Sequence, residues 1–116
     1  MTSSTGNGLL NDLQWFRAKG SDTFGPMGPA IATKLDYSDL RLRTWANGDL
    51  RQDSSTSELI YSPDKLLSYI YQFVTLMPGD VIFTGTPGKT QAVTHGDTIE
   101  IEIEGVGRLR NSVAVR

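Results

Sequence analysis

Lys19 is the residue whose position most directly suggests chemistry. It stands before Ser21–Pro29, a stretch with two glycines and two prolines in nine residues. Neither a helix nor a central strand tolerates that density, so we predict a shaped loop. A lysine beside such a loop can present its ammonium group to an anionic substrate. The neighbouring Asp12, Arg17 and Asp22 leave a second interpretation open, in which Lys19 belongs to the mixed charges of an exposed helix.

A row of carboxylates offers a second possibility. Residues 99–104 alternate isoleucine with glutamate, and three carboxylates on one strand face could bind a hard cation. The same alternation arises whenever one face of a strand packs on a core and the other meets water. We favour that interpretation and predict that the isoleucines face the core and the glutamates face solvent.

Two further motifs are weaker. Gly88-Lys89-Thr90 is similar to the end of a phosphate-binding loop, but the position that should hold its first glycine is Phe83. We therefore reject a phosphate-binding loop. His95 lies in Thr94–Asp97, a predicted turn ahead of a strand, and we interpret it as a surface histidine.

Composition narrows the classes of function. The chain has 116 residues, 38% hydrophobic and 21% charged, which is typical of one folded domain. Its net charge of −2 argues against a nucleic-acid-binding protein, which usually has a basic excess. The absence of cysteine excludes disulfides and thiolate sites, and a single histidine excludes a two-histidine metal site within this chain.

No segment predicts a membrane location. Met1–Gly8 lacks the basic start and apolar centre of a signal peptide, and we expect an irregular or disordered lead-in there, with one domain over residues 9–116. The longest mostly apolar stretch, Leu66–Met77, is far shorter than the roughly 20 residues that span a bilayer. We expect no membrane partner and, by default, a cytoplasmic protein.

The remaining patterns predict the elements that must position these residues. Strands are expected over 40–45 and 49–54 around Asn47-Gly48, because Asn-Gly favours the type I′ hairpin turn. Ser62-Pro63-Asp64 begins a helix, whose apolar face predicts one main helix near 63–74. Residues 80–84 predict a short buried strand, 84–88 a tight loop, and 99–104 with 108–115 a second hairpin. The expected fold is a β-rich α+β domain.

Three ordered motifs resemble the fumarylacetoacetate hydrolase family. They are RAKGSDTFGPMGP (17–29), LRLRTWANGDLRQDSSTS (40–57) and LMPGDVIFTGTPG (76–88), and the resemblance extends over residues 12–113. It implies a mixed β-sandwich or roll and a homodimer. It also implies an enzyme that uses Mg²⁺ or Mn²⁺ to stabilise the enolate formed from a 2-oxo acid.

The resemblance also assigns roles to individual residues. Lys19 matches an active-site lysine beside the metal, and Thr23 a position that organises the metal-side network. Thr86 matches a threonine that hydrogen-bonds substrate, and Gly85 contributes a backbone amide to the same anion. The family's Glu-x-Glu pair, metal-binding Asp and lid His/Glu lie upstream of Leu13 in full-length members, so we expect no metal ligand in this chain.

Two hypotheses follow. In the first, the chain is a fragment of an enzyme for hydrolysis, decarboxylation or isomerisation of 2-oxo or 2-hydroxy-dienoic acids, in aromatic-compound catabolism, and is inactive alone. In the second, it is a catalytically dead remnant that acts only as a binding or oligomerisation module.

Overall fold

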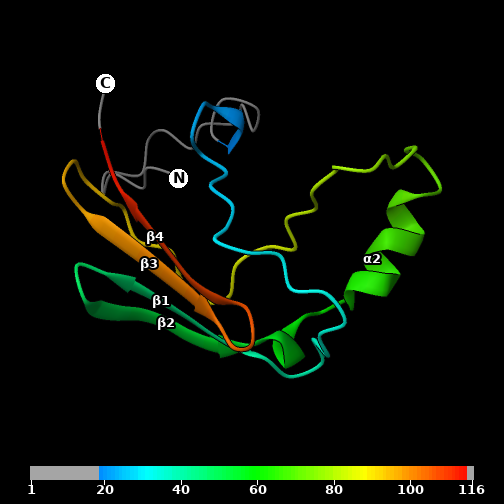
Figure 1. Cartoon of the computed structure of the whole chain (residues 1–116), viewed down its shortest axis with the longest axis horizontal. Coiled ribbons are helices and arrows are strands. Elements are labelled where there is room, and N and C mark those ends of the chain that lie inside the picture. The colour runs from blue at the N-terminus through cyan, green and yellow to red at the C-terminus, as the bar shows by residue number, and fades with distance from the viewer. Residues whose placement is uncertain (1–18, 115–116) are drawn as a thin grey trace.

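The computed structural model describes residues 19–114, in which four strands form one antiparallel sheet (Figure 1). The strands are β1 (Arg41–Ala46), β2 (Asp49–Ser55), β3 (Thr98–Ile103) and β4 (Gly107–Ser112), in the spatial order β2-β1-β3-β4. A 3₁₀ helix, η1 (Thr56–Glu58), follows β2, and one helix, α2 (Pro63–Ile70), lies away from the sheet. This arrangement confirms the predicted β-rich α+β class with one main helix.

The first hairpin turns where the sequence predicts. Asn47 and Gly48 both have positive φ, 54° and 87°, as a type I′ turn requires. The Asn47 side chain also reaches across the sheet: its Nδ2 donates to Asp97 Oδ1 at 2.8 Å and its Oδ1 accepts from the Thr98 backbone N–H at 2.9 Å. The turn therefore joins the two hairpins as well as closing the first.

The second hairpin is also confirmed, although β4 ends at Ser112 and not at residue 115. Its turn contains Gly105, with a φ of +74°, which only glycine adopts easily. A Cβ built on Gly105 would lie 3.0 Å from Leu35 Cδ1, so the turn packs closely on the segment that precedes β1.

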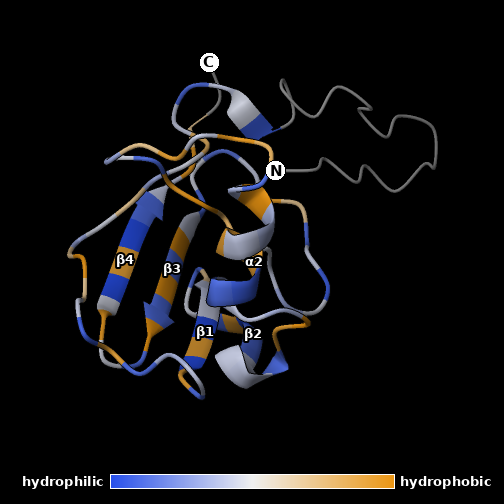
Figure 2. Cartoon of the chain, turned by 90° about the vertical axis from the view of Figure 1, so that its right-hand side faces the viewer, coloured by the Kyte–Doolittle hydropathy of each residue, from blue (hydrophilic) through white to orange (hydrophobic). Residues whose placement is uncertain are grey.

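The strand register divides the sheet into two faces. The isoleucine face carries mostly apolar side chains: Leu42, Thr44, Ala46, Ile99, Ile101, Ile103 and Leu109. The charged face carries Arg41, Arg43, Trp45, Asp53, Glu100, Glu102, Arg108 and Arg110. Figure 2 shows the resulting alternation of hydrophobic and hydrophilic residues along β3 and β4. Among the hydrophobic residues described, only Ala46 is buried, so the isoleucine face is not covered by a complete core in this chain.

The helix is shorter than predicted. Ser62 caps α2 by accepting from the Lys65 N–H, and Pro63 occupies its first turn, as expected. The helix ends at Ile70, and a turn follows it, in which the carbonyl of Ile70 accepts from the N–H groups of Phe73 and Val74, both at 3.0 Å. Phe73, which was predicted to extend the apolar face, is 71% exposed. A short helix gains its stability from packing, and this end has little.

The strand predicted over residues 80–84 does not form. Asp80 instead closes a turn with Met77, accepting from the Met77 N–H at 2.7 Å, and Val81 and Phe83 are exposed. A strand requires a neighbouring strand for its backbone hydrogen bonds, and within residues 19–114 none pairs with this segment. The segment is apolar, as the prediction requires, but no described strand lies beside it to accept its hydrogen bonds.

Two other features bear on the arrangement. Tyr37 donates its hydroxyl to Asp64 Oδ2 at 2.7 Å and so ties α2 to the segment before β1. In the described part of the chain, no helix is long and apolar enough to cross a membrane.

Candidate functional site: the 84–88 loop on the isoleucine face

The loop Thr84–Gly88 lies against the isoleucine face of the sheet, where the side chain of Gln52 holds it. Gln52 Nε2 donates to Thr86 Oγ1 at 3.2 Å and to the Pro87 carbonyl at 2.7 Å. A cavity of about 360 Å³ opens beside this contact. Thr86, Gln52 and Lys89 line it, together with residues from β1, β3 and the segment 90–97. The structure thus gives Thr86, a predicted substrate contact, a place on a cavity.

A β-bulge explains how β2 supplies this contact. Thr44 pairs with Gln52 but Trp45 pairs with Leu50, so Arg51 is an extra residue on β2. Consecutive side chains of a regular strand point to opposite faces, yet Arg51 and Gln52 both line the cavity. A bulge redirects side chains in this way. Arg51 then donates to Oε1 of Gln91, which also lines the cavity, at 2.6 Å.

The predicted loop 21–29 contains a strained residue. The N–H of Phe24 donates to the Ser21 carbonyl at 3.1 Å and closes a turn, whose third residue, Thr23, has a φ of 69°. That turn position normally takes glycine or asparagine, and a β-branched residue there costs of order 1–3 kcal/mol. Strain of this kind is frequent at functional sites, and the role that the resemblance implies for Thr23 stays a prediction.

One contact brings the two predicted loops together. A Cβ built on Gly25 would lie 3.3 Å from the ring of Phe83, so the 21–29 loop packs against the segment that leads to Gly85 and Thr86. Lys19 is exposed at a helical turn just before the same loop, and neither Lys19 nor Thr23 is among the residues lining the cavity. The structure therefore brings the loop that contains Thr23 next to the segment that leads to Gly85 and Thr86, and of the four predicted residues it places Thr86 on the cavity.

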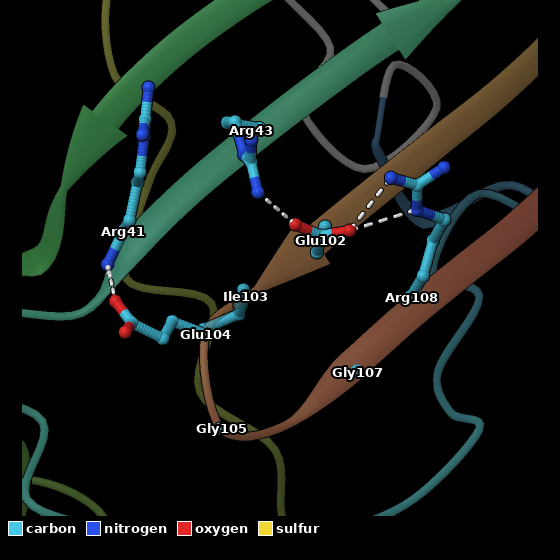
Figure 3. Close-up of a pocket in the computed structure, with 8 residues that line it drawn as sticks. All are labelled: Arg41, Arg43, Glu102, Ile103, Glu104, Gly105, Gly107 and Arg108. Atoms are coloured by element: carbon cyan, nitrogen blue, oxygen red, sulfur yellow. Dashed lines mark hydrogen bonds and ion pairs between the residues drawn. The ribbon is translucent and has the colours of Figure 1, made fainter.

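A second cavity, of about 510 Å³, lies on the charged face (Figure 3). Three of its charged groups are paired with one another: Glu102 Oε2 accepts from Arg108 at 2.7 Å, and Glu102 Oε1 pairs with Arg43. Arg108, and after it Arg43, holds the pKa of Glu102 below its ordinary value. The guanidinium carbons of Arg108 and Arg43 also lie 4.4 and 5.3 Å from the centre of the Trp45 ring. These pairings give the charged face a structural explanation.

The prediction of solvent-facing glutamates was therefore wrong in part. Glu100 and Glu102 are half-buried among arginines, whereas Ile101 on the opposite face is 38% exposed. The alternation correctly assigned the two kinds of side chain to two faces. It could not show that neighbouring strands would supply arginines to one face, or how little would cover the other.

The residues present do not fit a metal ion. Among residues 19–114, no group of three histidine, aspartate or glutamate side chains converges on one point. The glutamates of β3 are occupied by arginines, since Arg108 bridges Glu100 and Glu102. His95, predicted to lie in a surface turn, is exposed in the turn before β3.

The comparisons with known proteins identify the family. The family model described as "Fumarylacetoacetate (FAA) hydrolase C-terminal" matches residues 6–114. The chain therefore belongs to the fumarylacetoacetate hydrolase family, as its motifs predict. It is 48% identical, over 100 residues, to the 4-hydroxyphenylacetate degradation bifunctional isomerase/decarboxylase of Salmonella dublin, covering 84% of this chain and 23% of that protein.

Solved structures agree in fold. The 5-carboxymethyl-2-hydroxymuconate delta-isomerase of Mycobacterium smegmatis matches with a TM-score of 0.87 and 50% identity, over 90% of this chain and 42% of that one. The maleylpyruvate hydrolase of Sphingobium sp. SYK-6, in complex with manganese(II) and pyruvate, matches with a TM-score of 0.77 and 38% identity, over 80% and 36%. The chain spans 23% to 45% of the length of the curated relatives that it resembles.

Sequence reasoning missed Gln52 and Lys89 as residues of this site. Gln52 lies in a predicted strand and in the 40–57 motif of the family resemblance, but neither assigns it a role, and the β-bulge that aims it at the loop has no sequence pattern of its own. Lys89 belongs to the rejected phosphate-binding loop and, with Thr90, departs from the family pattern after residues 84–88, yet it lines the same cavity as Thr86.

Proposed function

We propose that this chain supplies the anion-binding loops of a divalent-metal-dependent enzyme that acts on 2-oxo or 2-hydroxy-dienoic acids. The reaction would be hydrolysis, decarboxylation or isomerisation at a carbon–carbon bond, within aromatic-compound catabolism. The observation that carries the proposal is the position of Thr86 on the cavity of the isoleucine face. Its support is the family membership, together with a relative whose structure holds manganese and pyruvate.

The chain's own residues would bind and orient the substrate anion. In this proposal the Thr86 hydroxyl and the Gly85 amide donate to a carboxylate or oxo oxygen, Lys19 neutralises its charge, and Thr23 orders the loop beside them. A hydrogen bond to an anionic oxygen is stronger than one between two neutral groups. Mg²⁺ or Mn²⁺ would be held by residues outside those described here.

Several further properties belong to the same proposal. Residues 9–116 would form part of a larger catalytic domain in a cytoplasmic homodimer. One observation favours the second hypothesis, a remnant that only binds or oligomerises: many large apolar side chains are exposed, including Ile31, Ile60 and Phe83. Exposed apolar patches of this kind usually mark interaction surfaces.

The test measures metal binding and turnover together. We expect the isolated chain to bind Mn²⁺ no more tightly than millimolar and to decarboxylate oxaloacetate no faster than Mn²⁺ alone. Joining it to the N-terminal part of the M. smegmatis isomerase should restore turnover, and Lys19→Ala should then abolish most of it. Lys65→Ala is the matched control, because Lys65 lies on α2 and stacks on Tyr61. A joined protein that folds but stays inactive would favour the remnant.

A further inference from the structure

The side chain of Gln52 joins the 84–88 loop to the sheet. The loop includes two glycines with positive φ, Gly85 (105°) and Gly88 (66°), and a proline that has no N–H to donate. Among residues 19–114, no backbone–backbone hydrogen bond ties residues 84–88 to another segment. The two bonds from Gln52 therefore provide an attachment that the loop's own backbone does not.

The chemical groups in these two hydrogen bonds determine which atom donates and which accepts. A carbonyl oxygen can only accept, so the Gln52 atom that lies 2.7 Å from the Pro87 carbonyl must be the amide nitrogen. Its second hydrogen is then directed to Thr86 Oγ1, 3.2 Å away. Thr86 accepts this bond through a lone pair, which leaves its own hydroxyl proton available to donate elsewhere.

We infer that Gln52 is a positioning residue that holds Thr86 in the orientation of a hydrogen-bond donor to a substrate oxygen. The inference rests on the proposed function, in which Thr86 contacts the substrate anion. Gln52 is half-buried on β2 and is aimed by the β-bulge at Arg51, so a well-paired sheet fixes its position. Thr86 is exposed at the tip of the loop and would otherwise sample several rotamers.

The first experiment needs no ligand. Amide hydrogen exchange of the full chain is compared with that of Gln52→Ala and of a matched control, Gln72→Ala. Gln72 also donates its side-chain amide to a backbone carbonyl, that of Ser68 at 3.2 Å, but on α2. We expect Gln52→Ala to speed exchange at Gly85, Thr86 and Gly88, and Gln72→Ala to leave it unchanged. Unchanged exchange at the loop in Gln52→Ala would overturn the inference.

The second experiment tests the donor orientation with pyruvate as the probe, observed by NMR at Thr86. We expect Gln52→Ala to weaken pyruvate binding about fivefold, the loss of one hydrogen bond. Gln52→Glu, equal in shape but unable to donate when ionised, should weaken it at least as much at pH 7. Binding by Gln52→Glu should recover towards pH 4.3, the approximate ordinary pKa of glutamate, because the carboxyl then carries a proton.

The outcomes distinguish the positioning role of Gln52 from the proposed function of the 84–88 loop. Equal pyruvate affinity in Gln52→Glu and the unsubstituted chain at pH 7 would overturn the positioning role, as would the lack of any recovery at low pH. If pyruvate leaves the Thr86 signals of the unsubstituted chain unchanged, the proposed function is contradicted for this loop. The exchange measurement would then decide alone for or against Gln52 as the residue that holds it.

Discussion

Asn47 offers a direct test of how the two hairpins are joined. Its Oδ1 accepts from the Thr98 N–H at 2.9 Å, a bond worth about 1 kcal/mol. Its φ of 54° would cost alanine about 1 kcal/mol more than glycine. We therefore expect Asn47→Gly to lower the free energy of unfolding by about 1 kcal/mol and Asn47→Ala by about 2 kcal/mol.

The assay is urea unfolding followed by circular dichroism, with the slope compared between variants to confirm that they unfold alike. The difference between Asn47→Ala and Asn47→Gly reports the backbone cost of alanine at positive φ. The loss in Asn47→Gly reports the removal of both side-chain hydrogen bonds, to Thr98 and to Asp97, less what glycine gains at this φ. Equal losses in the two variants would refute the turn geometry. An unchanged stability in Asn47→Gly would refute the contribution of the bridge to β3.

Asn47→Gly should also change the pKa of Asp97. Hydrogen bonds, first from Asn47 and then from the Thr94 backbone, hold the pKa of Asp97 below its ordinary value. A lowered pKa in the folded state stabilises the protein above the unfolded pKa, and that contribution is lost as the pH falls through the folded value. NMR titration of the Asp97 carboxyl should show a higher pKa in Asn47→Gly. An unchanged pKa would contradict the contact.

Four further outcomes are expected. Gly48→Val should destabilise the first hairpin by about 1 kcal/mol or more, because its φ is +87°, and an unchanged melting temperature would exclude a type I′ turn. Gly105→Ala should cost about 1–2 kcal/mol, since its Cβ would also meet Leu35 at 3.0 Å, and adding Leu35→Ala should remove the steric part of the loss. Stability should fall below about pH 4.3 as Glu102 is protonated, because its lowered pKa stabilises the folded state only above that range; Arg108→Ala should weaken this dependence in acid unfolding curves. Sedimentation should show self-association of the isolated chain through its exposed apolar side chains, and a stable monomer would contradict this.

The local elements could be predicted because short-range physics determines them. Asn47-Gly48 favours positive φ in a two-residue hairpin turn, and Ser62-Pro63 marks the start of a helix through a capping side chain and a fixed φ. The alternation over residues 99–104 likewise separated two kinds of side chain onto two faces. In each case the chemical information lies within a few residues.

The errors share one cause, which is partnership across the fold. Residues 80–84 have the composition of a strand, but no described strand lies beside them to accept their hydrogen bonds. The helix ends at Ile70, and the apolar side chains predicted to extend it, Phe73 and Val74, are exposed. Both predictions assumed neighbours that a local pattern cannot supply.

The sequence by itself determined the family, the hairpins and the identity of the residues that resemble an anion-binding site. Only the tertiary structure decided that a bulge on β2 aims Gln52 at Thr86, and that arginines from β1 and β4 surround Glu102. The Gln52–Thr86 and Arg43–Glu102 contacts join residues 34 and 59 positions apart in the chain, and the Arg108–Glu102 contact joins residues 6 apart across the second hairpin. Their geometry depends on strand register, which results from the pairing of whole strands and not from the residues that finally meet.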